Sequence, residues 1–285
     1  MGLVIHRAER ADVLVAALAE VLAAPSADPF APAIVAVPSR GVERWLAQQL
    51  SNVLGAVDGD GVCANVRFPS YRDLLDEQVA AADAGYAEAV ARWAPERATW
   101  PLLEVIDRCA PVEPWCAALA AHLDGAGPET PGGRRFAVAA KLTRFFDRYG
   151  RSRPELIAAW ADGRDEVPAD LAWQAELWRR LRAELGPSPA ELLDRACAAV
   201  PDGPDFSIFG ATRIPPARIT MLRAVARTRD VHLWLHHPSP ALWDAVRASG
   251  ERPGRRRDSQ PVARHPLLAS MSRDVRELQQ LLADV

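Results

Sequence analysis

The chain has 285 residues, a formal net charge of −3 and an apolar fraction of 49%. This length allows two packed domains, or one large domain with an insertion. The charge gives the chain as a whole no attraction for a polyanion, so a nucleic-acid site would have to be a local basic surface.

The first seventy residues alternate between strand-like and helix-like runs. The apolar runs at 3–8, at AIVAV just before Pro38 and at 62–68 are predicted strands. Between them, apolar residues recur at three- and four-residue spacing, which predicts two helices. Trp45 lies on the apolar stripe of the second helix, and we assign it to packing. This order is the start of a parallel α/β sheet.

The pattern changes after residue 70. Only helical periodicities follow until about residue 200, and strand-like runs return at 206–212 and 231–237. We therefore predict an α/β domain formed by 1–70 plus 203–285, with one parallel sheet, and an all-helical insertion at 71–202. The Arg- and Pro-rich run at 247–266 is expected to be a loop, and 265–285 a final helix.

Cysteine usage and hydropathy bear on the compartment. Cys63, Cys109, Cys116 and Cys197 form no C-x-x-C pair and have no His at metal-ligand spacing, which is typical of buried thiols in a reduced protein. The sequence opens with no signal peptide and contains no apolar run of about 18 residues. We expect a cytoplasmic protein without a membrane segment.

The common nucleotide and metal motifs are absent. A Walker A loop needs a Lys followed by Ser or Thr, and Lys141, the one lysine, has no such neighbour. The run DGDG (58–61) is predicted to be a turn, because position twelve of a calcium loop would be Pro69. His236 and His237 are strand neighbours that point to opposite faces, a poor metal geometry. We expect no catalytic residue, nucleotide or metal site in this chain.

One predicted helix of the insertion carries a line of basic residues. Lys141, Arg144, Arg148 and Arg151 follow the helical repeat, so they share one face and could track a phosphate backbone. The alternative is an ordinary solvated face with ion pairs between successive turns. Asp147, which lies among the arginines, favours that alternative.

A second candidate lies where a predicted strand meets a helix, at Pro38-Ser39-Arg40-Gly41. Amides at the start of a helix have no partner within it, and phosphate oxygens bind such positions readily. Ser39 can cap the helix, and Arg40 and Arg44 would add charge-assisted contacts. The alternative is a capped surface helix without a ligand.

Several runs of this sequence resemble a known family. They are VPSRGVERWLAQQLSNVLG with CANVRFPS, then FDRYGRSRPELIAAW and AWQAELWRRL, then FSIFGATRIPPARITMLRAVARTRDVHLWLHHPSPALWD, and finally HPLLASMSRDVRELQQLL. In this order they are similar to the N-terminal part of RecC proteins, the gamma subunits of the RecBCD helicase–nuclease (exodeoxyribonuclease V). The resemblance covers nearly the whole chain.

The resemblance implies a P-loop-helicase-like α/β domain without a working Walker A motif, together with the helical insertion. It implies a non-catalytic subunit in double-strand-break repair by homologous recombination, which threads the 3′-ended single strand and scans it for a recombination hotspot. RecB-like and RecD-like partners would bind the ATP and Mg²⁺. By position, it implies DNA contacts at Ser39, Arg40, Gly41, Arg44, Trp45, Ser70, Arg144, Asp147 and Arg153.

The sequence departs from the enterobacterial pattern at part of this set. Pro38, Arg40 and Arg44 stand where that pattern has Gln, Thr and Gln, and Arg144 replaces an acid. With these departures the resemblance still implies tracking of single-stranded DNA, but it does not imply recognition of the enterobacterial hotspot. Two other hypotheses are a helical scaffold that binds only protein partners and an active helicase, and the missing Walker lysine opposes the second.

Overall fold

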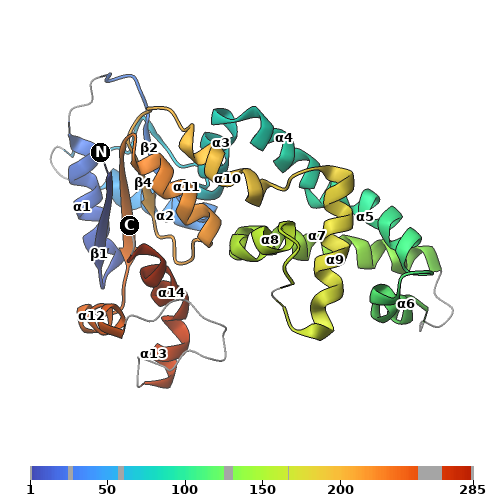
Figure 1. Ribbon diagram of the computed structural model, residues 1–285. Helices are drawn as coiled ribbons and strands as arrows, with labels where there is room; N and C mark the ends of the chain where they lie inside the picture. Colours follow the sequence, from blue (N-terminus) through green and yellow to red (C-terminus); the bar gives the residue numbers. More distant parts are fainter. Residues whose placement is uncertain are drawn as a thin grey trace. The chain divides into compact units, whose positions relative to one another are not determined.

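The structure, a computed structural model, describes residues 2–24, 28–56, 61–124, 131–165, 167–249 and 265–283. It divides into two compact units (Figure 1). The sheet unit comprises Met1–Gln78, Val200–Ile214 and Arg218–Val285, and the helical unit comprises Val79–Ala199 with Pro215–Ala217. Each candidate surface lies within one of these units.

The sheet unit is built on five parallel strands in the order β1-β5-β4-β2-β3. The predicted parallel α/β architecture is therefore confirmed, and AIVAV and VHLWL share one sheet through β4. The strands are β1 (Gly2–Ala8), β2 (Ala33–Ala36), β3 (Val66–Arg67), β4 (Phe206–Phe209) and β5 (Asp230–His236).

The third strand is much shorter than the predicted run at 62–68. Asn65 has a φ of 55°, a left-handed conformation that ends regular pairing and that Asn tolerates better than most residues. Its side-chain amide donates to the carbonyl of Ala31 at 3.1 Å. This bond ties the entry of β3 to the entry of β2.

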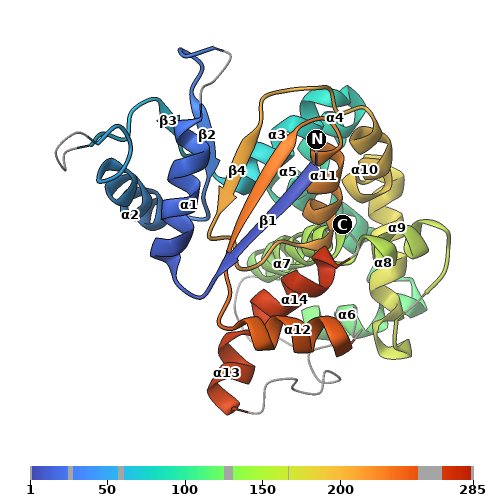
Figure 2. The same ribbon diagram turned by 90° about the vertical axis from the view of Figure 1, so that its left-hand side faces the viewer.

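Helices cover the sheet on both sides (Figure 2). On one side, α1 (Ala11–Ala23) and α2 (Arg40–Ser51) bury Leu18, Leu46 and Leu50 in a core with Trp234 of β5. The other helices of this unit are most of α3 (Tyr71–Ala82) and of α11 (Pro216–Ala226), together with α12 (Pro240–Ser249), α13 (Pro266–Met271) and α14 (Arg273–Leu282). The predicted final helix is thus two helices, because Ser272 interrupts it. The predicted loop at 247–266 and the DGDG turn lie largely outside the described residues.

Every regular element that the structure describes in the helical unit is a helix. Its core contains three tryptophans, Trp93, Trp160 and Trp178, with α5 and α7 packed against each other. The elements are α4 (Ala84–Trp93), α5 (Pro95–Cys109), η1 (Pro114–Cys116), α6 (Ala117–Asp124), α7 (Pro131–Ser152), α8 (Pro154–Ala161), η2 (Ala169–Leu171), α9 (Ala172–Leu185) and α10 (Pro189–Ala198).

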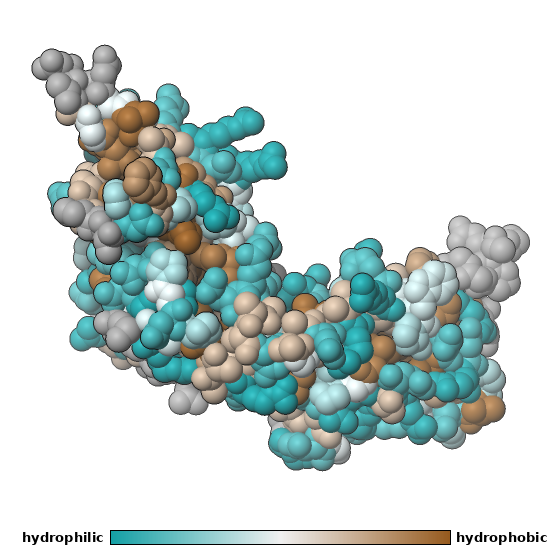
Figure 3. All heavy atoms as spheres, turned by 90° about the horizontal axis from the view of Figure 1, so that it is seen from above, coloured by the Kyte–Doolittle hydropathy of each residue, from teal (hydrophilic) through white to brown (hydrophobic). Residues whose placement is uncertain are grey.

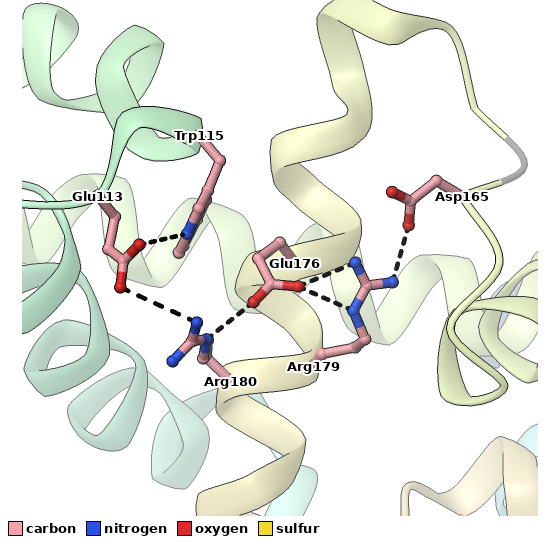
Figure 4. Close-up of polar contacts among 6 residues, drawn as sticks. All are labelled: Glu113, Trp115, Asp165, Glu176, Arg179 and Arg180. Carbon is pink, nitrogen blue, oxygen red and sulfur yellow. Dashed lines mark hydrogen bonds and ion pairs between the residues drawn. The ribbon is translucent and has the colours of Figure 1, made fainter.

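A polar network centred on α9 joins this helix to the segments that carry Glu113 and Asp165 (Figure 4). Glu176 accepts from Arg180 at 2.8 Å and from Arg179 at 3.0 Å, and Arg179 also donates to Asp165 at 2.7 Å. Burial alone would raise the pKa of Glu176, yet the hydrogen bonds from Arg180 and Arg179 outweigh it and hold the pKa below its usual value. Glu176 therefore has a structural role as an ionised carboxylate that holds Arg179 and Arg180.

The structure bears on the predicted absences only for the residues that it describes. Within them, no group of three His, Cys, Asp or Glu side chains could hold a metal, and no helix is long and apolar enough to span a membrane. At the end of β5, His236 is exposed and His237 is buried, with Nδ1 of His237 3.0 Å from the carbonyl oxygen of Ser239. The two rings therefore lie in different surroundings, as expected.

Candidate functional site

The first candidate surface lies at the carboxyl end of the sheet, between β2 and β4. The chain leaves β2 through α2 toward β3, whereas it leaves β4 through α11 toward β5, on the opposite side. Such a point, where connections diverge, is where open parallel sheets bind their ligands. The loop Pro38–Gly41 follows β2 at this position, so the sequence-predicted loop lies at the switch point of the sheet.

The local geometry of this loop is a capped helix start, as predicted. Ser39 is extended, its Oγ accepts from the amide of Val42 at 3.4 Å, and its carbonyl accepts from the amide of Glu43 at 3.0 Å. The preceding amides, those of Arg40 and Gly41, have no acceptor within the helix. A Cβ on Gly41 would lie 3.7 Å from Ser39 Oγ, an ordinary contact, so this position does not require glycine.

Two arginines extend from the first turn of α2. Arg40 and Arg44 are exposed and lie one helical turn apart. Neither forms an ion pair with a residue that the structure describes. Glu43, in the same turn, is the opposing charge. The two guanidinium groups are therefore available to an anion.

Trp45, which the sequence pattern assigned to packing, packs at the rim of the sheet. Its side chain is 36% exposed, and its ring centroid lies 6.2 Å from that of the buried Phe209 at the end of β4. Leu46 and Leu50 fill the core instead. The indole therefore lies at the rim of the sheet, with part of its ring exposed.

Ser70, which the resemblance assigned, is brought beside the same loop. Beyond β3 the chain continues parallel to β2, with Val37 bridged to Ser70, and the amide of Val37 donates to the carbonyl of Pro69 at 2.9 Å. The Ser70 carbonyl accepts from Leu74 at 3.0 Å, so α3 begins here. Two helix starts, of α2 and α3, therefore lie next to each other, although Ser39 and Ser70 are far apart in sequence.

The second candidate surface is the basic line on α7, in the helical unit. Lys141, Arg144, Arg148 and Arg151 are all exposed, as the helical repeat predicted. On the other side of α7, Leu142 and Phe146 are buried in the core and Phe145 and Tyr149 are half-buried. Figure 3 shows hydrophilic and apolar side chains interspersed on the face that it draws, so hydropathy alone does not mark a site.

The charges on α7 are partly matched within the helix. Arg151 forms an ion pair with Asp147, which is the pairing expected for a solvated face. The cationic groups of Lys141 and Arg148 lie 5.8 and 5.9 Å from the ring centroid of Phe145, within the range of cation–π attraction. Arg153 is exposed at the N-cap of α8. Arg144 is therefore the member of the line with the fewest contacts described.

Comparisons with known proteins decide the family. A family model described as "RecC, N-terminal domain" matches residues 3–285. The chain belongs to the RecC family. This confirms the resemblance that the sequence motifs indicated.

Curated RecC proteins are similar to the chain over nearly its whole length. It is 45% identical over 300 residues to "RecBCD enzyme subunit RecC" of Mycobacterium tuberculosis strain H37Rv, covering 99% of the chain and 27% of that protein. It is 43% identical to the protein of the same name from Mycolicibacterium smegmatis, over all of the chain and 26% of that protein. Identity falls to 24% with the Escherichia coli K12 protein, over 77% of the chain and 20% of that protein. The chain thus spans about a quarter of the length of these RecC relatives.

Proposed function

We propose that this chain is a non-catalytic, DNA-binding part of a RecBCD-type helicase–nuclease that acts in double-strand-break repair by homologous recombination. It would hold the 3′-ended single strand after unwinding and scan it for a hotspot. RecB-like and RecD-like subunits would be its partners. Membership of the RecC family is the observation that carries this proposal.

The geometry of the sheet unit supports a phosphate contact. Two exposed arginines, Arg40 and Arg44, lie at the start of α2, where the helix dipole also favours an anion. Ser70 is bridged to Val37, three residues before Arg40. Because a guanidinium group can donate two parallel hydrogen bonds to a phosphate, each arginine suits one phosphate of a DNA backbone.

The proposal assigns no ATP hydrolysis to this chain. Its one lysine, Lys141, lies in the middle of α7, where no phosphate-binding loop precedes it. We therefore propose that the sheet unit is a helicase-like domain without a nucleotide site, and that the partner subunits bind ATP and Mg²⁺.

Removal of the two arginines tests the proposal. The complex assembled with its partner subunits should bind a duplex end with a 3′ single-stranded extension, measured by fluorescence anisotropy at several salt concentrations. In the double variant Arg40→Ala/Arg44→Ala, the slope of log affinity against log salt should fall by about 1.4, at about 0.7 for each lost single-strand phosphate contact. The loss should be similar for all DNA sequences, because phosphate contacts carry no sequence information.

A matched control uses two arginines elsewhere. Arg108 and Arg164 are exposed in the helical unit, and neither is assigned a DNA contact. The variant Arg108→Ala/Arg164→Ala should leave the salt slope unchanged. Equal salt slopes for the wild-type complex and the Arg40/Arg44 variant would mean that this loop is only a helix cap. A complex that assembles normally, but in which no arginine substitution in this chain changes DNA affinity, would support the protein-scaffold alternative.

A further inference from the structure

We propose that Trp45 and Arg213 extend the DNA contact at the switch point, Trp45 by stacking on an unpaired base and Arg213 by holding a neighbouring phosphate. The inference rests on the proposed function. It gives Trp45, for which the resemblance implied a DNA contact and the helical pattern implied packing, the specific role of a stacking platform, and it adds Arg213, which the sequence did not assign to DNA. Both residues lie in the sheet unit, on segments that follow β2 and β4.

Trp45 keeps part of its ring exposed. Within the sheet unit, Trp234 is fully buried, whereas Trp45 is 36% exposed at the rim of the sheet. Its ring is supported by Phe209 at a centroid distance of 6.2 Å and an interplanar angle of 38°. An indole that is supported on one side and exposed on another loses little conformational freedom when a flat base packs against it.

The loop after β4 brings Arg213 to the same edge. Gly210 has a φ of 74°, a conformation that favours glycine, and turns the chain at the end of the strand. A Cβ on Gly210 would lie 3.7 Å from Val42 Cγ1, so the loop runs beside the first turn of α2. Ala211 and Ile214 are buried and anchor the loop, which leaves Arg213 exposed between them.

A buried tyrosine fixes the backbone of this loop. The hydroxyl of Tyr71 donates to the carbonyl of Arg213 at 2.9 Å, and the Tyr71 side chain is only 1% exposed. Tyr71 directly follows Ser70, so the segments after β2, β3 and β4 are joined by hydrogen bonds at this edge. The side chain of Arg213 forms no ion pair with a described residue, although its backbone is held in place.

The charge at this edge favours a polyanion although the chain as a whole is acidic. The segments after β2, β3 and β4 carry more exposed arginines than the first turns of α2 and α3 carry carboxylates. The arginines are Arg40, Arg44, Arg72 and Arg213, and the carboxylates are Glu43 and Asp73. A local excess of positive charge around an exposed aromatic ring is the combination that proteins use to bind single strands without sequence preference.

Two probes separate stacking from phosphate binding. One is an oligo-dT strand of about 20 nucleotides, and the other is an abasic strand of the same length, which keeps the phosphates and lacks the bases. With the full 285-residue chain, Trp45→Leu should weaken oligo-dT binding about fivefold to a hundredfold and leave abasic-strand binding unchanged. Arg213→Gln should weaken both alike and lower the salt slope by about 0.7.

The control for the indole is Trp100→Leu. Trp100 is 60% exposed on α5 of the helical unit, and its loss should change neither affinity. If Trp45→Leu fails to fold, Trp45→Phe serves instead, and the smaller ring should give an intermediate oligo-dT affinity. A Trp45 variant that weakens both probes equally, or neither, overturns the inference.

The remaining outcomes distinguish this inference from the proposed function. A wild-type chain that binds neither probe contradicts both. Weakening by Arg40→Ala/Arg44→Ala, together with unchanged binding by the Trp45 and Arg213 variants, overturns the inference alone. If the Trp45 variants bind DNA normally but no longer assemble with the partner subunits, the exposed indole is a protein contact and the inference is wrong.

Discussion

A pair of buried threonine hydroxyls between α5 and α7 gives the sharpest test of how the helical unit is stabilised. The Oγ1 atoms of Thr99 and Thr143 are 3.2 Å apart, and both side chains are buried. Thr99 donates its single hydroxyl proton to the carbonyl of Pro95 at 2.6 Å. The bond between the two threonines can therefore use only the proton of Thr143, whose other acceptor is the carbonyl of Ala140 at 3.1 Å.

This proton inventory predicts unequal effects. Thr143→Val keeps the shape of the side chain but leaves Thr99 Oγ1 without a donor, so the free energy of unfolding should fall by about 1 kcal/mol. Thr99→Val should cost more, about 1–2 kcal/mol, because it removes the bond to the carbonyl of Pro95 as well as the acceptor of the Thr143 proton, which can then turn only to Ala140. In the double variant both hydroxyls are gone, and its loss should be smaller than the sum of the single losses by about 0.5–1 kcal/mol.

Urea unfolding followed by tryptophan fluorescence measures these values, because Trp160 and Trp178 lie in the same core. Thr212→Val, at an exposed threonine of the sheet unit, is the matched control and should change stability by less than about 0.5 kcal/mol. Additive losses, or a Thr143→Val variant as stable as the wild type, would refute the assignment of the proton.

Three further predictions concern single side chains. Because the pKa of Glu176 is lowered, its carboxylate stabilises the fold above the usual pKa of the group, and the stability advantage over Glu176→Gln in urea unfolding should shrink as the pH falls from neutral to about 3. Burial raises the pKa of Cys116 to about 11, so a thiol reagent should modify the half-buried Cys63 first at neutral pH, and modification of native Cys116 at an equal rate would contradict this. Gly210→Ala should lower the free energy of unfolding by about 1–2 kcal/mol because of its positive φ, whereas Gly41→Ala should not.

The features that could be predicted from the sequence are those set by local patterns. Apolar runs of buried parallel strands, a serine before a helix and basic residues at the helical repeat each depend on neighbours within a few positions. They gave the parallel sheet, the cap at Ser39 and the exposed line on α7 correctly. The family motifs extended this to Ser70, which the structure places beside the Ser39 loop.

The features that could not be predicted depend on contacts between distant segments. The strand order puts β4 beside β2, and only this pairing brings the loop of Arg213 to the start of α2. The exposure of Trp45 depends on how much of α2 the sheet covers, and the length of β3 on the left-handed Asn65. None of these follows from periodicity, because helical spacing indicates a face but not how wide its buried part is.

The strand order also separates two places in the sheet. A Walker A loop would follow β1, whereas the candidate DNA contact follows β2 and β4. β1 is at the edge of the sheet, and in the exposed segment after it Arg10 Nε donates to Asp12 at 3.0 Å. The switch point comes after β2 and β4 instead, where exposed arginines surround helix starts. A bound nucleotide needs a glycine-rich loop that wraps its phosphates, whereas a DNA backbone offers one phosphate after another to separate donors. Separate donors on α2 and on the loop after β4 suit the second kind of ligand, which supports the proposed contact with a DNA strand at this edge.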